Sequence, residues 1–140
     1  MTFTIDVRTG DAPEIHSFLE QRIYEFNAAA TGYRDAESFH GVHRDESGEI
    51  VAGICGYTWG ACCYVAYLWV SAPIRGQRLG STLLQAVERH AREKACYLVW
   101  LSTHTFQAPA FYAQHGYEQI ARIEGYPRKH GSLLFMKRLS

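Results

Sequence analysis

An uncharged run of aromatic and β-branched residues leads into a turn rich in glycine and arginine, and the turn leads into a helix. The run spans residues 62–70 and is typical of a central strand covered on both faces. The turn Arg75-Gly-Gln-Arg-Leu-Gly80 follows it, and apolar residues then recur at helical spacing until residue 94. A strand, a tight turn and a helix in this order predict an α/β fold.

Periodicity and turn signals predict the remaining elements. Apolar residues alternate over residues 2–8, which predicts a half-buried strand, and Asp11 is the expected N-cap of the next helix, with Pro13 in its first turn. Asp45–Gly48 separates two strand-like segments and predicts a hairpin, and Gly116 is expected to end a short helix. In chain order we expect strand 2–8, helix 11–27, strands 39–44, 49–57 and 62–70, the helix ending near 94, strand 97–101, helix 107–114, and strands 117–123 and 132–137.

Length, charge and cysteine content narrow the functional classes. A chain of 140 residues fits a single domain that spans residues 1–140. Its 14 basic and 14 acidic side chains balance, which argues against a nucleic-acid or membrane partner. The four cysteines lack metal-type spacing, so we expect no metal and buried thiols of a reduced compartment. Because no signal peptide or membrane-spanning run is evident, we expect a cytoplasmic protein.

The Gly-Arg turn is a candidate phosphate site. The first N–H groups of a helix lack internal partners, and the helix macrodipole is positive at that end. Gly76 and Gly80 let the backbone approach an anion closely, and Arg75 and Arg78 add positive charge. A tight turn with solvated arginines fits the same residues equally well. A nucleotide-binding P-loop fits poorly, because the turn lacks the lysine and Ser or Thr of that motif.

Three segments in their order and spacing resemble the GNAT superfamily of N-acetyltransferases. They are Leu68-Trp-Val70, Arg75-Gly-Gln-Arg-Leu-Gly80 and Phe111-Tyr-Ala-Gln-His-Gly-Tyr117. The segments 105–112, 125–130 and 135–139 look like those of small bacterial members of unassigned substrate. The resemblance implies a mixed, mostly antiparallel sheet of about six or seven strands, flanked by helices and opened by a splayed central strand pair. It also implies acetyl-CoA as the cosubstrate.

The resemblance assigns cofactor contacts residue by residue. Leu68, Trp69 and Val70 match the strand whose backbone pairs with the pantetheine arm. The pyrophosphate would lie against the backbone of Arg75, Gly76, Gln77, Arg78, Leu79, Gly80 and Ser81. Arg78 stands where the family usually has its first glycine, so this position has a Cβ and less freedom to adopt a positive φ. Thr105 replaces an asparagine that is common in the family and keeps a hydrogen-bonding side chain.

The resemblance also supplies a mechanism. Tyr112 matches a tyrosine that lies near the thioester sulfur and protonates the departing thiolate. A phenol with an ordinary pKa of about 10 can donate to a thiolate whose conjugate acid titrates near ~8.5. A primary amine of a small molecule or peptide would attack directly in a ternary complex, and a backbone N–H near residues 69–70 would stabilise the oxyanion. Without the resemblance, Phe111 and Tyr112 would be interpreted as core aromatics.

The sequence does not determine which group deprotonates the amine. Some family members carry a glutamate on the strand that matches residues 64–70, and this chain has no carboxylate there. The candidates are Glu37, His40, His43, His104 or a water chain, and histidine side chains ordinarily titrate near neutral pH. His104 follows a predicted central strand, at the end where sites in such sheets gather, although a surface histidine in a loop is the more common case.

Aromatic residues indicate where an amine acceptor binds. Tyr126 and His130 flank Pro127 in the last strand connection, beside which acceptor loops of this fold often lie, and an exposed hairpin connection explains them equally well. A second candidate is a cation–π floor made by Trp59, Tyr64, Tyr67 and Trp69, although most aromatics at strand spacing belong to a core. Exposed strand edges favour a homodimer. The alternative function is an acyl-CoA-binding sensor or interaction module without catalysis.

Overall fold

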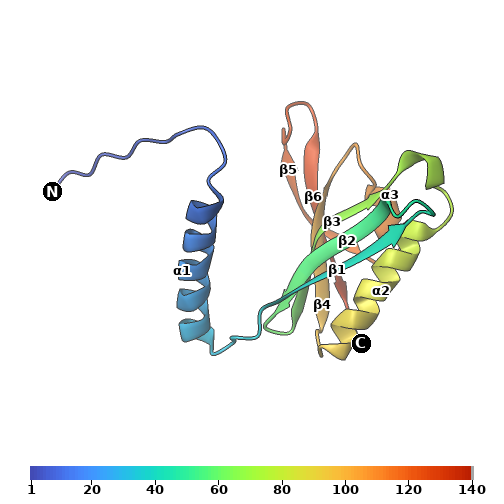
Figure 1. Ribbon diagram of the computed structural model, residues 1–140, viewed down its shortest axis with the longest axis horizontal. Coiled ribbons are helices and arrows are strands. Elements are labelled where there is room, and N and C mark those ends of the chain that lie inside the picture. The colour runs from blue at the N-terminus through green and yellow to red at the C-terminus, as the bar shows by residue number, and fades with distance from the viewer. Residues whose placement is uncertain (140) are drawn as a thin grey trace. The chain divides into compact units, whose positions relative to one another are not determined.

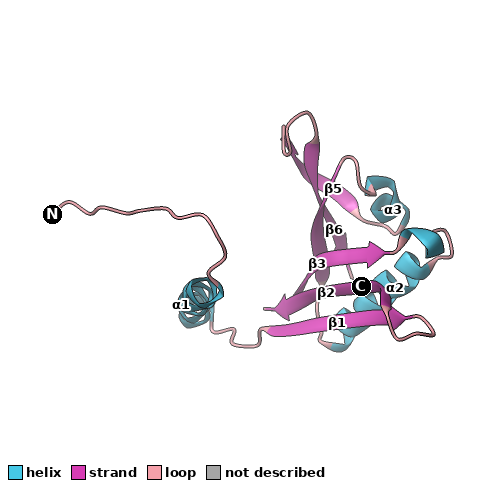
Figure 2. Cartoon of the chain, turned by 45° about the horizontal axis from the view of Figure 1, so that its top comes forward, coloured by secondary structure: helices cyan, strands magenta, loops and turns pink. Residues whose placement is uncertain are grey.

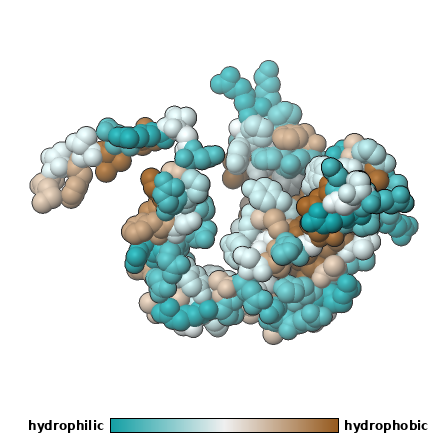
Figure 3. Space-filling model, viewed as in Figure 1, coloured by the Kyte–Doolittle hydropathy of each residue, from teal (hydrophilic) through white to brown (hydrophobic). Residues whose placement is uncertain are grey.

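The computed structural model describes residues 1–139, which form two units divided after Arg34 (Figure 1). The first unit contains an extended segment and the helix α1 (Pro13–Thr31). This helix presents apolar side chains at its surface (Figure 3), because a single helix has no core of its own in which to bury them. They include Ile15, Phe18, Leu19, Ile23 and Phe26.

Two predictions for this unit are wrong. Residues 2–8 form no strand, because a strand needs a neighbour that shares its backbone hydrogen bonds and none pairs with them among the described residues. Ala12, and not Asp11, is the N-cap of α1, and no side chain caps the helix. Pro13 explains the shift, because the residue before a proline is held out of the helical region. The helix continues beyond residue 27 and ends at Gly32, whose φ of 81° is left-handed.

The second unit contains one sheet of six described strands in the order β1-β2-β3-β4-β6-β5, and Figure 1 labels each of them. Only β3 and β4 run parallel, so the sheet is mixed and mostly antiparallel, as predicted. The elements are β1 (Glu37–Arg44), β2 (Ile50–Trp59), β3 (Cys62–Val70), the 3₁₀ turn η1 (Ala72–Ile74), α2 (Leu79–Glu93), β4 (Leu98–His104), α3 (Pro109–Gln114), β5 (Glu118–Glu124) and β6 (Gly131–Arg138).

The core of this unit lies between the sheet and the two helices α2 and α3 (Figure 2). The apolar stripe of α2 packs on the inward-facing residues of β2, β3, β4 and β6. Its buried residues Leu83, Leu84, Val87 and Ala91 recur at helical spacing, as expected for a one-sided amphipathic helix. The prediction that both faces of β3 are covered is wrong within this unit, because Tyr67 is 76% exposed.

Candidate active site

The strands β3 and β4 pair over only three residues at their beginnings. The last pair is Tyr64 with Trp100, and no pairing between the two strands follows within the described chain, although β3 extends to Val70 and β4 to His104. β3 stays paired with β2, and β4 stays paired with β6. The two halves of the sheet therefore diverge, which confirms the predicted splayed pair, and the backbone of residues 65–70 borders the opening.

A β-bulge in β3 lies where this divergence begins. The register between β2 and β3 shifts between Cys55 and Gly56, which leaves Ala66 as an extra residue. A Cβ added at Gly56 would lie 1.9 Å from the carbonyl oxygen of Tyr64, so only glycine fits opposite the bulge. Because bulges bend a strand and increase its twist, this one directs the second half of β3 away from β4.

The bulge also changes which side chains of β3 face the core. Val65 is buried, and beyond the extra residue Leu68 and Val70 pack against the core. Tyr67 and Trp69 therefore lie on the opposite face, where both are exposed. The backbone of all three predicted pantetheine-binding residues, 68–70, lies along the opening, and a main-chain contact does not depend on which way their side chains point.

The turn after β3 leaves the first N–H groups of α2 available to a ligand. The N-cap is Arg78, which makes no side-chain capping bond, and the helix ladder starts with the N–H of Thr82 donating to the carbonyl oxygen of Arg78. Arg78 itself adopts a left-handed conformation with φ 64°, although such backbone costs a non-glycine residue about 1 kcal/mol or more. The arginine thus takes the φ region that glycine favours.

The three segments of the sequence motif meet at Gly80. A Cβ added there would lie 3.5 Å from the ring of Phe111 on α3 and 3.8 Å from a methyl group of Val70 on β3. One residue further, Ser81 Oγ lies 2.9 Å from Nε2 of His115, the residue that ends α3. The Nε of Arg75 donates to the carbonyl oxygen of Val70 at 2.9 Å, which ties the turn to the end of β3.

Comparison with known proteins assigns this arrangement to a family. Residues 4–117 match the Acetyltransferase (GNAT) family. This chain belongs to that family. A blasticidin-S acetyltransferase from Streptomyces morookaense is 40% identical over 95 residues, which are 67% of this acetyltransferase and 70% of the relative.

Solved structures place this acetyltransferase among proteins of the same fold. The crystal structure of an acetyltransferase from Bacillus cereus ATCC 14579 is 30% identical, with a TM-score of 0.81 over 96% of this chain and 98% of the other. An aminoglycoside 6'-N-acetyltransferase complexed with coenzyme A shares the fold at 17% identity, with a TM-score of 0.62 over 73% of each chain.

Tyr112 of this acetyltransferase lies in an aromatic environment. The residue is only 8% exposed, and its ring centroid lies 5.1 Å from that of Phe111, 5.9 Å from that of Tyr117 and 6.1 Å from that of Phe135. Burial raises the pKa of the Tyr112 phenol above its ordinary value. The hydroxyl group therefore keeps its proton at neutral pH, which a proton donor requires.

Thr105 connects β4 to β6 at the open end of the sheet. Its backbone N–H donates to the carbonyl oxygen of Gly131 at 2.9 Å, and its Oγ1 accepts from the Gly131 N–H at 3.2 Å. The hydroxyl can still donate its own hydrogen. Its predicted contact with the cofactor stays a prediction, and its structural role is to hold the segment after β4 in place.

The candidate bases lie in different parts of the sheet. Glu37, at the start of β1, pairs with Lys94 at 3.1 Å. His40 and His43 also lie on β1, which is two strands from β3 and hence roughly 10 Å away at the usual spacing between strands. His104 ends β4 and borders the opening. Its ring contacts Phe106, a residue that sequence reasoning did not single out.

Tyr64 of the predicted aromatic floor has two ring neighbours that were not predicted. Tyr64 contacts the rings of Tyr57 and Trp100, at centroid distances of 5.2 Å and 4.3 Å. Trp100 is the β4 residue opposite Tyr64, so the register of the last β3–β4 pair creates this contact. Sequence reasoning missed both partners, because strand alternation cannot show which strands become neighbours.

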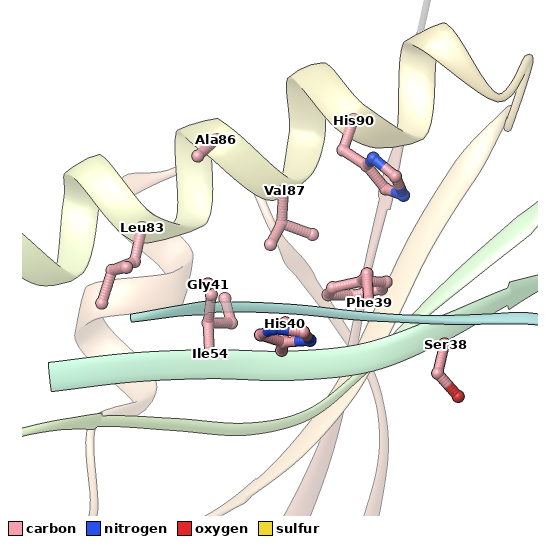
Figure 4. Close-up of a pocket in the computed structure, with 9 residues that line it drawn as sticks. All are labelled: Ser38, Phe39, His40, Gly41, Ile54, Leu83, Ala86, Val87 and His90. Atoms are coloured by element: carbon pink, nitrogen blue, oxygen red, sulfur yellow. The ribbon is translucent and has the colours of Figure 1, made fainter. Parts of the chain in front are cut away.

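A cavity of about 340 Å³ lies between β1, β2 and α2 (Figure 4). His90 points into it from α2 and contacts the ring of Phe39 at 5.5 Å. The Nε2 of His90 is buried and has no hydrogen-bond partner among the described residues. None of the predicted cofactor residues lines this cavity, so it is separate from the opening between β3 and β4.

Residues 1–139 contain neither a candidate membrane-spanning helix nor a candidate metal-binding cluster. No helix in this part of the chain is both long and apolar enough to span a membrane. No three His, Cys, Asp or Glu side chains of these residues come together in a way that could hold a metal ion.

Proposed function

We propose that this acetyltransferase transfers an acetyl group from acetyl-CoA to a primary amine of a small molecule or peptide. The convergence of β3, the turn before α2, and α3 at Gly80 carries this proposal. This convergence would bring a phosphate-binding helix end, a strand edge that is unpaired on the β4 side and a buried phenol to one opening. Coenzyme A in the aminoglycoside acetyltransferase of the same fold supports the choice of cofactor.

The turn before α2 would bind the pyrophosphate. The N–H groups of residues 79–81 precede the first helical hydrogen bond of α2, and no side chain caps them. The arginines at 75 and 78 add charge-assisted contacts. The backbone of residues 68–70 would pair with the pantetheine amides, and this contact would direct the thioester into the opening beside β4.

Tyr112 would act as the general acid. The neutral amine nitrogen forms a bond to the thioester carbon, and a backbone N–H near residues 69–70 stabilises the oxyanion. The carbon–sulfur bond then breaks, and the thiolate takes the proton of the phenol. The proton that the amine nitrogen loses on collapse restores the phenol through solvent. Because burial keeps Tyr112 protonated, the donor is ready throughout the physiological pH range.

The relative from Streptomyces morookaense suggests the first acceptor to test. Its name gives blasticidin S as the molecule that it acetylates, and 40% identity makes the same compound the natural starting point here. The acyl chain preference, a homodimeric state and a cytoplasmic location stay predictions that this proposal does not require.

Calorimetric titration with acetyl-CoA, CoA and ATP tests the cofactor. We expect micromolar binding of both CoA species and none of ATP, and absence of CoA binding would refute the proposal. Tyr112→Phe then separates an enzyme from a binding module. We expect this variant to bind acetyl-CoA normally and to lose about 10²-fold or more in kcat on blasticidin S. If the wild-type protein binds acetyl-CoA but acetylates no amine, the sensor or interaction module is correct instead.

A further inference from the structure

His104 is held in one orientation by contacts from two segments, the connection after β4 and the connection between β5 and β6. Its backbone N–H donates to Oε1 of Gln107 at 2.7 Å, which fixes the end of β4. Its ring stacks on Phe106 with a centroid distance of 5.3 Å and an interplanar angle of 3°. The ring of Tyr126, from the connection between β5 and β6, meets it edge-on at 5.2 Å. A half-buried imidazole with two aromatic neighbours has little rotational freedom.

The hydrogen bond of the ring defines its tautomer. Nδ1 of His104 lies 3.2 Å from the backbone carbonyl oxygen of Tyr126. A carbonyl oxygen can only accept a hydrogen bond, so the hydrogen must be on Nδ1. In the neutral imidazole this leaves Nε2 with an unshared electron pair. The same hydrogen bond can stay in place when Nε2 takes up a proton, because Nδ1 keeps its hydrogen in both forms of the ring.

The position of His104 relative to the opening suits a base. Along β4, Leu101 and Thr103 are buried in the core, so the alternating side chains of Ser102 and His104 lie on the other face of the sheet. Tyr112 belongs to the core side. A thioester in the opening would thus have the phenol on one side and the imidazole on the other. An amine can then approach from the imidazole side while the sulfur leaves toward the phenol.

We propose that Nε2 of His104 is the general base of this acetyltransferase, an inference that rests on the proposed function. Nε2 takes one proton from the acceptor ammonium group, which gives a neutral amine and an imidazolium ion. The amine nitrogen then bonds to the thioester carbon, and the imidazolium returns its proton to solvent after product release. This balance accounts for the one proton that an ammonium substrate releases when it becomes an amide.

The tautomer can be tested without any acceptor. The ring nitrogens of 15N-labelled protein give separate NMR signals for each neutral tautomer, and the His104→Asn spectrum identifies the signals of His104 among the seven histidines. We expect a hydrogen on Nδ1 and none on Nε2 in the neutral form. A hydrogen on Nε2 instead would overturn the assignment, whatever the protein acetylates.

Chemical rescue tests the catalytic role. We expect His104→Ala to bind acetyl-CoA with unchanged affinity and to lose about 10²-fold in kcat on blasticidin S, or on any other amine that the wild type acetylates. Added imidazole should restore part of the lost rate. A merely structural role of His104 would not lead to such rescue. His43→Ala tests a rival candidate on the edge strand β1, where unchanged rates are expected, and a loss there that imidazole rescues would contradict the role of His104.

The outcomes separate this inference from the function on which it rests. A wild-type protein that binds no acetyl-CoA contradicts both. A wild-type protein that acetylates an amine, together with a His104→Ala variant of equal rate or one that imidazole does not rescue, contradicts the role of His104 alone. If no tested amine is acetylated, the NMR tautomer decides whether His104 can serve as a base at all.

Discussion

The segment after β3 and the segment after β4 follow neighbouring parallel strands, yet they are built differently. In β3 and the turn that follows it, the features are made by the backbone: a bulge opposite a glycine within the strand, then a left-handed arginine and uncapped N–H groups. After β4 they are made by side chains, because His104 is oriented by Phe106 and by the distant Tyr126. On the proposed function, the first segment would bind the phosphates and the pantetheine arm, and the second would lie beside the amine acceptor.

The largest expected effect tests the backbone features of β3 and of the turn after it. Gly56→Ala would place a Cβ 1.9 Å from the carbonyl oxygen of Tyr64, so the bulge must shift. We expect a loss of about 3 kcal/mol in the free energy of unfolding, measured by urea denaturation. Gly41→Ala is the matched control on β1, because a Cβ there would lie an ordinary 3.8 Å from the nearest atom, a methyl group of Ile54. Its free energy of unfolding should stay within about 0.5 kcal/mol of the wild-type value. Equal stability of the two variants would show that the bulge does not depend on glycine.

Stability at alkaline pH tests whether Tyr112 is buried as described. Burial raises the pKa of its phenol, and burial also raises the pKa of the Cys63 thiol to about 12. The folded chain therefore keeps protons that the unfolded chain releases above pH ~9, so the unfolding free energy must fall as pH rises beyond that point. Tyr112→Phe removes one of these groups. We expect its free energy of unfolding to fall less steeply between pH 9 and 11 than that of the wild type, and parallel curves would contradict a raised Tyr112 pKa.

A pair of substitutions at Arg78 separates charge from conformation. Both Arg78→Ala and Arg78→Gly remove the guanidinium group, so each should weaken acetyl-CoA binding by about tenfold in calorimetry. Only glycine relieves the left-handed strain, and Arg78→Gly should therefore be more stable than Arg78→Ala by about 1 kcal/mol. Unchanged affinity in both variants would mean that the backbone alone binds the phosphates. Equal stability of Arg78→Gly and Arg78→Ala would mean that the left-handed conformation does not destabilise the alanine variant.

The same contrast explains what the sequence could predict. The bounds of β3 and the left-handed Gly116 follow from local patterns, and the structure confirms both. The bulge depends on how β2 registers against β3, which no local pattern contains. Likewise Tyr126 meets His104 only because β5 and β6 pair and β6 lies beside β4. The family motif predicted the backbone part of the candidate site, and sequence reasoning named His104 and Tyr126 separately, whereas the contact between these two residues required the sheet order.

The smallest expected effect tests the side-chain contacts that orient His104, at Phe106. Its ring stacks on His104 and also meets His130 edge-on at 4.9 Å, but it is 55% exposed and donates no hydrogen bond to the imidazole. Stacking of this kind contributes about 0.5–1.5 kcal/mol, so Phe106→Leu should lower kcat by only about threefold, measured on the same amine as the wild type. Phe106→Tyr keeps the ring and should act as the wild type. Because the bond from Nδ1 to the Tyr126 carbonyl oxygen remains, the NMR tautomer of His104 should not change in either variant. A loss as large as that of His104→Ala would instead make the aromatic stack, and not the carbonyl oxygen, the main element that orients the base.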